Sequence, residues 1–256
     1  MAQALREASR KDAAVGQEVL DRVRAVLRSP RSDPSRPSVT LAYAQSFDGC
    51  IAEGPGMSTA ISNSQSQILT HELRAMHDAL LVGVNTVIVD DPRLDVRLVP
   101  GANPIPVIVD SSLRIPFDVR LLKKVGPPPL VVATRGACEE KRAALADLGA
   151  EVLCVDADSD GSVDLGSLLV MLGERGIRSL MIEGGAKIIT SVLAGELADQ
   201  LVLTISPQFL GGVRSVESFA GRGCDRRPEL TDVFCERIGS DLVVQGEFLR
   251  SAHARN

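Results

Sequence analysis

Apolar and polar positions along the chain follow a pattern that predicts an α/β fold. Short, continuous apolar runs indicate strands buried on both faces, as in a parallel sheet. Between them lie segments whose apolar positions recur every three or four residues, which is typical of helices. Predicted strands cover 39–44, 79–84, 104–110, 129–134, 151–156, 178–183 and 200–207. Predicted helices cover 62–77, with Ser62 or Ser64 as the N-cap, and 139–149, 164–176 and 185–198.

The two ends of the chain depart from this alternation. Segments 234–239 and 241–248 predict a closing antiparallel hairpin. Residues 1–28 carry valines at near-helical spacing and predict a helix that docks on the body or contacts a partner. A proline- and serine-rich stretch then breaks the helix. We therefore expect an N-terminal helical extension with its linker over 1–37, and one domain over 38–250 built on a mixed, mostly parallel sheet with helices on both faces.

Composition excludes several classes of protein. A net charge of −5 and the lack of a basic run argue against nucleic-acid binding. No apolar stretch approaches the ~20 residues that span a bilayer, and no apolar secretory signal opens the chain, so we expect a cytoplasmic protein. The five cysteines form no C-x-x-C pair, so we expect no metal site.

A glycine pair follows the predicted strand 178–183 and opens the next predicted helix. In the sequence Glu183-Gly184-Gly185, the glycines allow the backbone to approach a ligand closely. The helix N-terminus offers free N–H groups suited to a pyrophosphate. Glu183 falls at the carboxyl end of a strand, where open α/β sheets place their ligands. A tight turn with a solvated glutamate fits the local sequence equally well, and the G-x-G-x-x-G pattern of a standard Rossmann site is absent.

Further polar residues cluster after two predicted strands. Segment 83–94 contains Thr86 and Asp90, which are suited to hydrogen-bond a ribose or an amide. Its Asp-Asp-Pro sequence also fits a capped turn, and we expect its adjacent carboxylates to point apart on an extended backbone, unlike a metal pair. Arg74 and Arg97 are candidates for bidentate contacts to a phosphate, although each also fits an ordinary surface arginine.

The spacing of the histidines suggests no further chemistry. His71, His77 and His253 lack partners at nucleophile or metal spacing. Ala75 stands where a second histidine would complete H-E-x-x-H after His71. No G-x-S-x-G motif supports a serine hydrolase.

Taken together, these segments resemble the pyrimidine reductase family of riboflavin biosynthesis. That family comprises a stand-alone reductase and the reductase domain of a bifunctional deaminase–reductase. The resemblance spans about 38–248. The sequences of 39–44 and 70–74 are more similar to those of the stand-alone fungal type. The lack of a zinc motif, which a deaminase domain would carry, agrees with that type. The matching stretches are VTLAYAQSFDG (39–49), THELRAMHDALLVGVNTVIVDDPRL (70–94), PIPVIVDSSLRIP (104–116) and LMIEGGAKI (180–188).

The resemblance implies a dihydrofolate-reductase-like fold, NADPH as hydride donor, a small phosphorylated ribosylamino-pyrimidine as substrate, and a homodimer. It makes Glu183 the expected catalytic residue. The expected cofactor-binding residues are Ala44, Thr86, Asp90, Ser111, Gly184, Gly185, Ala186, Lys187 and Ile188. The expected substrate-binding residues are Ser58, Arg74, Leu94, Arg97 and Glu183, with Ser58 and the arginines on the sugar phosphate. Arg114 and Arg135 are candidates for the cofactor's 2′-phosphate.

The chain departs from the family at two positions. Ala42 stands where bacterial members often carry a lysine, and Ala60 where many place a tryptophan. Both changes leave Glu183, Asp90 or an ordered water as candidate proton sources. Two other functions stay open: a pterin- or dihydrofolate-type reductase on the same fold, and a non-catalytic nucleotide-binding homologue. Because the resemblance begins after the extension, removal of residues 1–36 is expected to leave activity intact.

Overall fold

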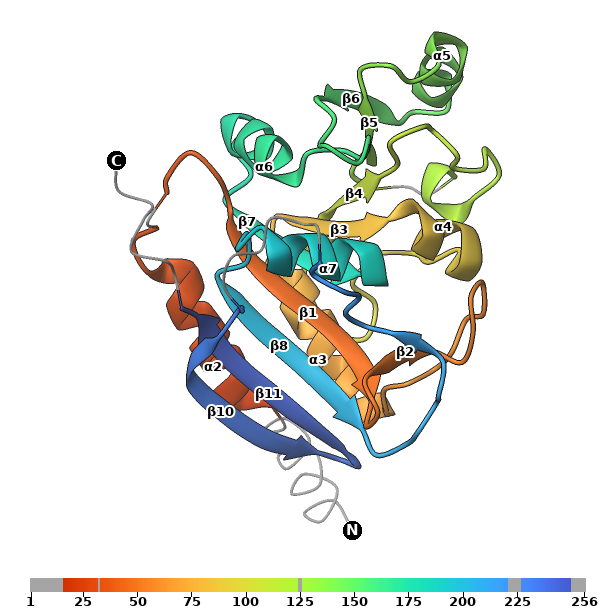
Figure 1. Cartoon of the computed structure of the whole chain (residues 1–256). Coiled ribbons are helices and arrows are strands. Elements are labelled where there is room, and N and C mark those ends of the chain that lie inside the picture. The colour runs from red at the N-terminus through yellow and green to blue at the C-terminus, as the bar shows by residue number, and fades with distance from the viewer. Residues whose placement is uncertain (1–15, 32, 124–125, 221–226, 250–256) are drawn as a thin grey trace.

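One twisted sheet organises the molecule (Figure 1). The computed structural model describes residues 16–31, 33–123, 126–220 and 227–249. Within these ranges the sheet has the strand order β10-β11-β8-β1-β7-β3-β4-β5-β6. Its strands are β1 (Ser38–Ser46), β3 (Ala79–Gly83), β4 (Ile105–Val109), β5 (Leu130–Thr134), β6 (Glu151–Val155), β7 (Ser179–Gly184), β8 (Gln200–Ser206), β10 (Leu230–Ile238) and β11 (Asp241–Phe248).

Neighbouring strands from β8 through to β6 run parallel, while β11 pairs antiparallel with both β8 and β10. The strands β2 (Cys50–Ala52) and β9 (Val213–Arg214) form a separate small ladder that the sequence did not predict. The parallel run arises from the continuous apolar segments, and the hairpin from the alternating segments around Gly239. The predicted class, a dihydrofolate-reductase-like α/β fold with a mixed, mostly parallel sheet and a C-terminal hairpin, is confirmed.

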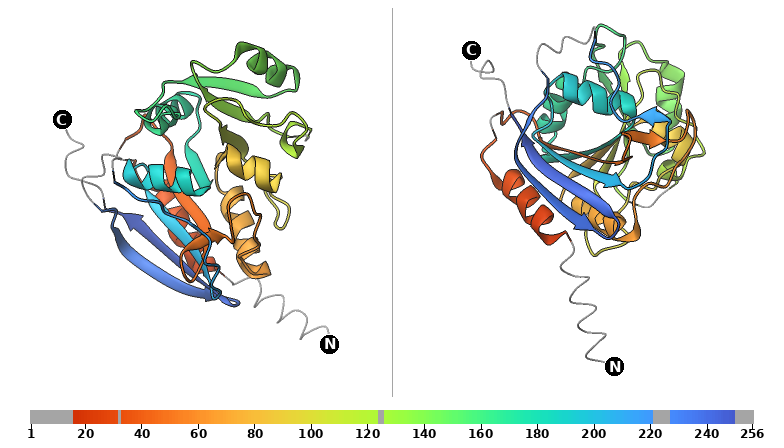
Figure 2. Two further views of the ribbon diagram at one scale, coloured as in Figure 1. Left: turned by 45° about the vertical axis from the view of Figure 1, so that its right-hand side comes forward. Right: turned by 60° about the horizontal axis from the view of Figure 1, so that its bottom comes forward.

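Helices cover both faces of the sheet, and Figure 2 shows α3 and α7 on opposite sides of it. One core cluster joins the sheet to α2 (Gln17–Arg28), α3 (Ser64–Ala75), α4 (Val84–Asp90) and α5 (Glu139–Asp147). The other joins it to α6 (Leu165–Glu174) and α7 (Ala186–Ala194). A short 3₁₀ helix, Arg120–Leu122, lies between β4 and β5. Aliphatic side chains fill both clusters, as a sequence without tryptophan requires.

Two sequence predictions need correction. Segment 83–94 is not an extended loop, because α4 occupies Val84–Asp90 and buries Val84 and Val87. The β-branched valines and isoleucine of that segment resemble a continuing strand, and tertiary packing overrides this local preference. The cap of α3 is neither Ser62 nor Ser64 but Asn63, whose side-chain oxygen accepts hydrogen bonds from the N–H groups of Gln65 and Ser66.

The N-terminal helix α2 is part of the core. Val19 and Val23 are fully buried, Leu20 is nearly so, and all three belong to the cluster shared with α3. Residues 1–15 and 32 of the predicted extension lie outside the described residues, as do 124–125, 221–226 and 250 of the predicted domain. The packing of α2 argues that removal of residues 1–36 would expose apolar core, so we no longer expect that truncation to be harmless.

Replacing a buried α2 side chain therefore tests the role of this helix in stability. Leu20→Ala should lower the free energy of unfolding by about 2–4 kcal/mol, because it leaves a cavity in a packed cluster. Urea unfolding followed by circular dichroism measures the change. Arg24→Ala, which removes only a surface ion pair with Asp21, is the control and should cost less than about 1 kcal/mol. Equal, small losses in both variants would contradict a structural role for α2.

Candidate active site

A cleft of about 360 Å³ opens at the carboxyl ends of the central parallel strands, on the face covered by α3. Its floor comes from β1, β7 and β8, and its wall from α3 and the segments before and after it. This edge is where open α/β sheets bind ligands, because strand ends and loops meet there. The lining residues are Ala42, Tyr43, Ala44, Thr59, Ile61, Ser62, Gln67, Leu69, Thr70, His71, Leu73, Arg74, Asp90, Arg97, Met181, Glu183, Val202 and Thr204.

Glu183 enters this cleft from an irregularity in β7. Leu81 of β3 pairs with Ile182, but the next residue, Val82, pairs with Gly184. Glu183 is therefore an extra residue in the ladder, a β-bulge. Bulges recur beside active sites, where they redirect a side chain at the end of a strand.

Arg74 on α3 holds the Glu183 carboxylate through two hydrogen bonds. Its Nε and Nη2 atoms donate to Oε1 and Oε2 at 2.5 and 2.7 Å. Its Nη1 donates to the backbone carbonyl of Asp95 at 3.0 Å. Burial disfavours the charged guanidinium, but the Glu183 carboxylate outweighs it, so the pKa of Arg74 is raised. The pair thus places a fixed carboxylate in the cleft, and it uses the donor groups that the sequence assigned to a phosphate.

His71 also lines the cleft, although no motif in the sequence selected it. It is 3% exposed, and its Nδ1 accepts the backbone N–H of Arg97 at 3.1 Å. Burial, followed by the positive charges of Arg74 and Arg97, lowers the pKa of His71 to about 4. Neutral His71 therefore carries its proton on Nε2.

Arg97 presents the more accessible guanidinium of the two predicted arginines. Its side chain is 47% exposed, and its Nη1 donates to Asp95 Oδ1 at 2.7 Å. The predicted pair Arg74 and Arg97 thus divides into a half-buried guanidinium fixed on Glu183 and an exposed one at the rim. A rim guanidinium with further N–H donors is suited to an anionic group that enters from solvent.

The glycine turn and the α4 segment meet at the same edge of the sheet. Gly184 and Gly185 have φ values of 108° and 94°, which strongly favour glycine. Gly185 is the N-cap of α7 and brings no side-chain cap, while a Cβ added there would lie 3.4 Å from the Thr86 hydroxyl oxygen. The two segments that the sequence pointed to therefore converge beside the N–H groups of a helix N-terminus.

The other predicted site residues divide by accessibility. Ala44 and Asp90 line the cleft, Ser58 is exposed beside the lining residue Thr59, and Lys187 is exposed on α7. Leu94 is 1% exposed with a φ of 45°, so its side chain packs in the core and only its backbone can reach a ligand. Ser111 Oγ accepts the N–H of Val163. Ala186 and Ile188 lie in the first turn of α7, partly exposed.

The arginines proposed for a 2′-phosphate lie beyond the cleft lining. Arg135 pairs with Asp156, with both side chains largely exposed. Arg114 Nε lies 3.8 Å from the buried carboxylate of Asp110. Both guanidinium groups thus have local carboxylate partners, and neither is among the residues that line the cleft.

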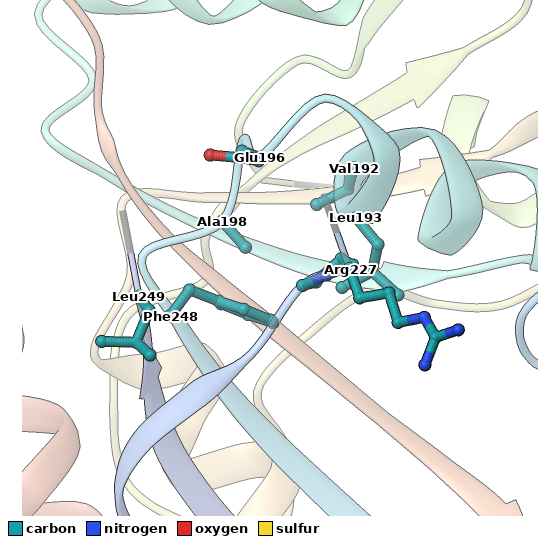
Figure 3. Close-up of a pocket in the computed structure, with 8 residues that line it drawn as sticks. Val192, Leu193, Glu196, Ala198, Arg227, Phe248 and Leu249 are labelled. Atoms are coloured by element: carbon teal, nitrogen blue, oxygen red, sulfur yellow. The ribbon is translucent and has the colours of Figure 1, made fainter. Parts of the chain in front are cut away.

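A second pocket lies at the C-terminal end of α7, as Figure 3 shows. Val192 and Leu193 of α7 line it with Phe248 at the end of β11. Its volume is about 20 Å³, and none of the predicted site residues lines it. In the part of the chain that the structure describes, no cluster of His, Cys, Asp or Glu is arranged to hold a metal ion, and no helix is long and apolar enough to cross a bilayer.

The parallel sheet, the cleft at its carboxyl edge and the glycine turn define the class of the protein, an α/β enzyme. The chain belongs to the RibD C-terminal domain family, whose model matches residues 37–244. Both the family and the architecture that the sequence suggested are thereby confirmed.

Relatives with assigned names cover most of the chain. The 2,5-diamino-6-ribosylamino-4(3H)-pyrimidinone 5′-phosphate reductase of Methanothermobacter thermautotrophicus is 37% identical over 216 residues, which is 82% of this chain and 97% of the relative. The reductase of the same name from Saccharomyces cerevisiae is 38% identical, covering 68% and 74%. Riboflavin biosynthesis protein RibD of Aquifex aeolicus is 34% identical, and the match covers 82% of this chain but 57% of that protein.

Solved structures agree with the sequence relatives. Riboflavin Biosynthesis Reductase Rib7 of S. cerevisiae superposes with a TM-score of 0.68 at 28% identity, covering 86% of this chain and 93% of that one. RibD of Acinetobacter baumannii gives 0.69 at 26% identity, covering 84% and 58%. The match therefore takes in nearly all of the yeast protein and somewhat more than half of RibD.

The neutral state of His71 gives a pH-dependent prediction. Unfolding returns its pKa to about 6.5, so the unfolded chain binds a proton first as the pH falls. The contribution of neutral His71 to the free energy of unfolding is complete above about pH 6.5 and is lost as the pH falls from about 6.5 to 4. This contribution is at most about 3 kcal/mol. An NMR titration of the His71 Cε1–H resonance should give a midpoint near 4. A midpoint near the ordinary histidine value would contradict the buried, cation-flanked environment.

Proposed function

We propose that this protein is an NADPH-dependent reductase that converts the ribosylamino side chain of a pyrimidinone 5′-phosphate to ribitylamino in riboflavin biosynthesis. The relatives that match most of its length carry the name of that reductase. The observation that carries the proposal is the Arg74–Glu183 pair, which fixes a carboxylate in the cleft on the strand that leads into the glycine turn. From the same resemblance we infer a cytoplasmic homodimer.

The glycine turn supports the nucleotide cofactor. Side-chain atoms are absent from Gly184 and Gly185, and α7 begins without a side-chain cap, so its first N–H groups are available to a pyrophosphate. Thr86 Oγ1 lies against Gly185 and is suited to hydrogen-bond the same ligand. Asp90 lines the cleft at the end of α4. NADPH, when bound, supplies the hydride, and the protein supplies binding and orientation.

The residues of the cleft orient the sugar. Reduction requires the ribosylamino ring to open to an imine whose carbon, the former anomeric carbon, accepts hydride. Arg74 holds both carboxylate oxygens of Glu183, so the side chain stays in place during the reaction. We assign it to bind a sugar hydroxyl or the imine N–H. Its negative charge also favours a protonated imine, which accepts hydride more readily than a neutral one.

The proton source differs from a lysine mechanism. Ala42 lines the cleft floor, so its methyl group replaces an ammonium at that position. His71 is a candidate for holding a sugar oxygen through Nε2–H, but its lowered pKa leaves the ring neutral near pH 7, so it has no imidazolium proton to donate. We infer that a water molecule beside Asp90 or Glu183 delivers the proton. The substrate still bears its amino group in our proposal, so reduction precedes deamination, in keeping with the stand-alone type.

Charge at the rim favours this function over a pterin-type reductase. Arg97 offers an exposed guanidinium that suits a substrate phosphate. A pterin has no phosphate and gains nothing from such a group. A non-catalytic homologue has no need of the fixed Glu183 carboxylate.

Substitution of the carboxylate tests the catalytic assignment. Glu183→Gln retains the size of the side chain but removes its charge, and kcat should fall about 100-fold or more. NADPH oxidation at 340 nm with the aminated pyrimidine phosphate measures it. Asp91→Asn is the control, because Asp91 is adjacent to Asp90 but does not line the cleft. This variant should keep near-normal kcat. Full turnover in Glu183→Gln would remove this residue from the chemistry.

Loss of the rim guanidinium tests phosphate binding. Arg97→Ala should raise KM for the phosphorylated substrate about tenfold or more and change kcat less, because one charge-assisted contact is lost from both ground and transition states. Steady-state kinetics with the phosphorylated and dephosphorylated substrates provide the comparison. An equal KM increase for both substrates would contradict a phosphate contact.

A further inference from the structure

Four buried polar side chains, Gln245, Gln200, Thr40 and His77, form a line of hydrogen-bonded groups across the sheet, beside the cleft. Thr40 and Gln200 lie two residues before the cleft residues Ala42 and Val202 on β1 and β8, so they share the same face. Gln245 on β11 extends the line toward α2, and His77 extends it toward the end of α3. All four polar side chains are 5% exposed or less. Polar groups this deeply buried cost stability unless they are hydrogen-bonded to one another.

Arg22 of α2 sets the direction of these hydrogen bonds. A guanidinium only donates, so its Nε must donate to Gln245 Oε1, at 2.7 Å. The amide nitrogen of Gln245 then faces Gln200 Oε1, at 3.5 Å. The amide nitrogen of Gln200 in turn donates to Thr40 Oγ1, at 2.9 Å. The single hydroxyl proton of Thr40 is left for His77 Nε2, at 2.8 Å.

The opposite end requires the same direction. The backbone carbonyl of Leu73 only accepts, and it lies 2.7 Å from His77 Nδ1. His77 must therefore carry its proton on Nδ1, which leaves Nε2 free to accept from Thr40. A second proton on His77 would leave the Thr40 hydroxyl proton without an acceptor in the line. Burial independently lowers the pKa of His77, so the neutral ring is favoured.

The line ends on the segment of α3 that carries the site. Leu73 directly precedes Arg74, and the backbone N–H of His77 donates to the Arg74 carbonyl at 3.3 Å. His71 lies on the same turn of α3. The position of this turn determines how Arg74 meets Glu183 on β7, a contact made across two elements and therefore sensitive to small shifts.

We propose that Arg22 is a positioning residue for the cleft, acting through the one-way hydrogen-bond line Arg22–Gln245–Gln200–Thr40–His77 to fix the end of α3. Arg22 and Gln245 both lie outside residues 37–244, the segment matched by the family model. The N-terminal helix thus contributes to the site as well as to the core. This inference rests on the proposed reductase function for its kinetic test, but not for its spectroscopic test.

The spectroscopic test uses the tautomers of the histidines. The chain has three histidines, so a ¹⁵N-histidine spectrum at pH 7 is readily assigned with His253→Gln as an aid. We expect His77 as the Nδ1–H tautomer and His71 as the opposite Nε2–H tautomer, because Arg97 donates to His71 Nδ1. An Nε2–H tautomer for His77 would overturn the direction of the line, whether or not the protein is a reductase.

The kinetic test breaks the line far from the cleft. Arg22→Met and Gln245→Leu should each lower kcat about three- to tenfold, with KM changed less, after correction for the folded fraction from unfolding curves. Arg22 also pairs with Asp232 and lies over the Phe234 ring. Asp232→Asn removes the ion pair and keeps the bond to Gln245, so it should retain wild-type kcat.

A second control separates positioning from stability. Val23→Ala weakens the packing of α2 but leaves the polar line intact, so it should lower stability without lowering corrected kcat. Wild-type kcat in a folded Arg22→Met, or the same loss of kcat in Val23→Ala, would overturn the positioning role. An inactive wild-type protein with the expected tautomers would instead count against the proposed function alone.

Discussion

The bidentate contact between Arg74 and Glu183 is the interaction on which the site depends, because it joins α3 to β7 at the cleft and holds the carboxylate on both oxygens. One partner comes from α3, which packs on one face of the sheet, and the other from the bulge of β7. Both charges are half-buried, so either one would be costly without its partner. The pair thus couples folding to function: the sheet and α3 must dock correctly before a charged group can stand in the cleft. His71, on the same turn, is kept neutral partly by the cation that fixes the carboxylate.

Much of the architecture followed from the sequence because parallel strands carry a strong signal. Continuous apolar runs such as 79–84 and 129–134 fell on β3 and β5, and alternation with helical segments implied the doubly covered sheet. The glycine pair at 184–185 was also recognisable, since two adjacent glycines at a strand–helix junction point to the positive φ angles found there. Helix α4 was missed because its β-branched sequence favours a strand locally, and only packing of Val84 and Val87 decides otherwise.

The site was less accessible from the sequence than the fold. Motif resemblance selected Ala44, Arg74, Asp90, Arg97 and Glu183, all of which line one cleft. It could not reveal that Arg74 is engaged with Glu183, because the two residues lie 109 positions apart and meet only in space. Nor could it select His71, whose partner is a backbone N–H, a group that leaves no trace in side-chain identity. The polar line from Arg22 could not be predicted from the sequence either, because single glutamines and threonines in strands do not indicate which residues they contact.

The bulge at Glu183 also constrains how this strand can change during evolution. Side chains alternate across a strand, so loss of one residue turns every later residue to the opposite face. In β7 the residues that follow are the glycine turn and the first turn of α7, with no intervening loop to absorb a shift. A single-residue deletion here would therefore remove the acid and rotate the helix start away from Thr86 in one step. Insertions and deletions among relatives should therefore fall in other parts of the chain. The junction between β7 and α7 should keep a constant number of residues.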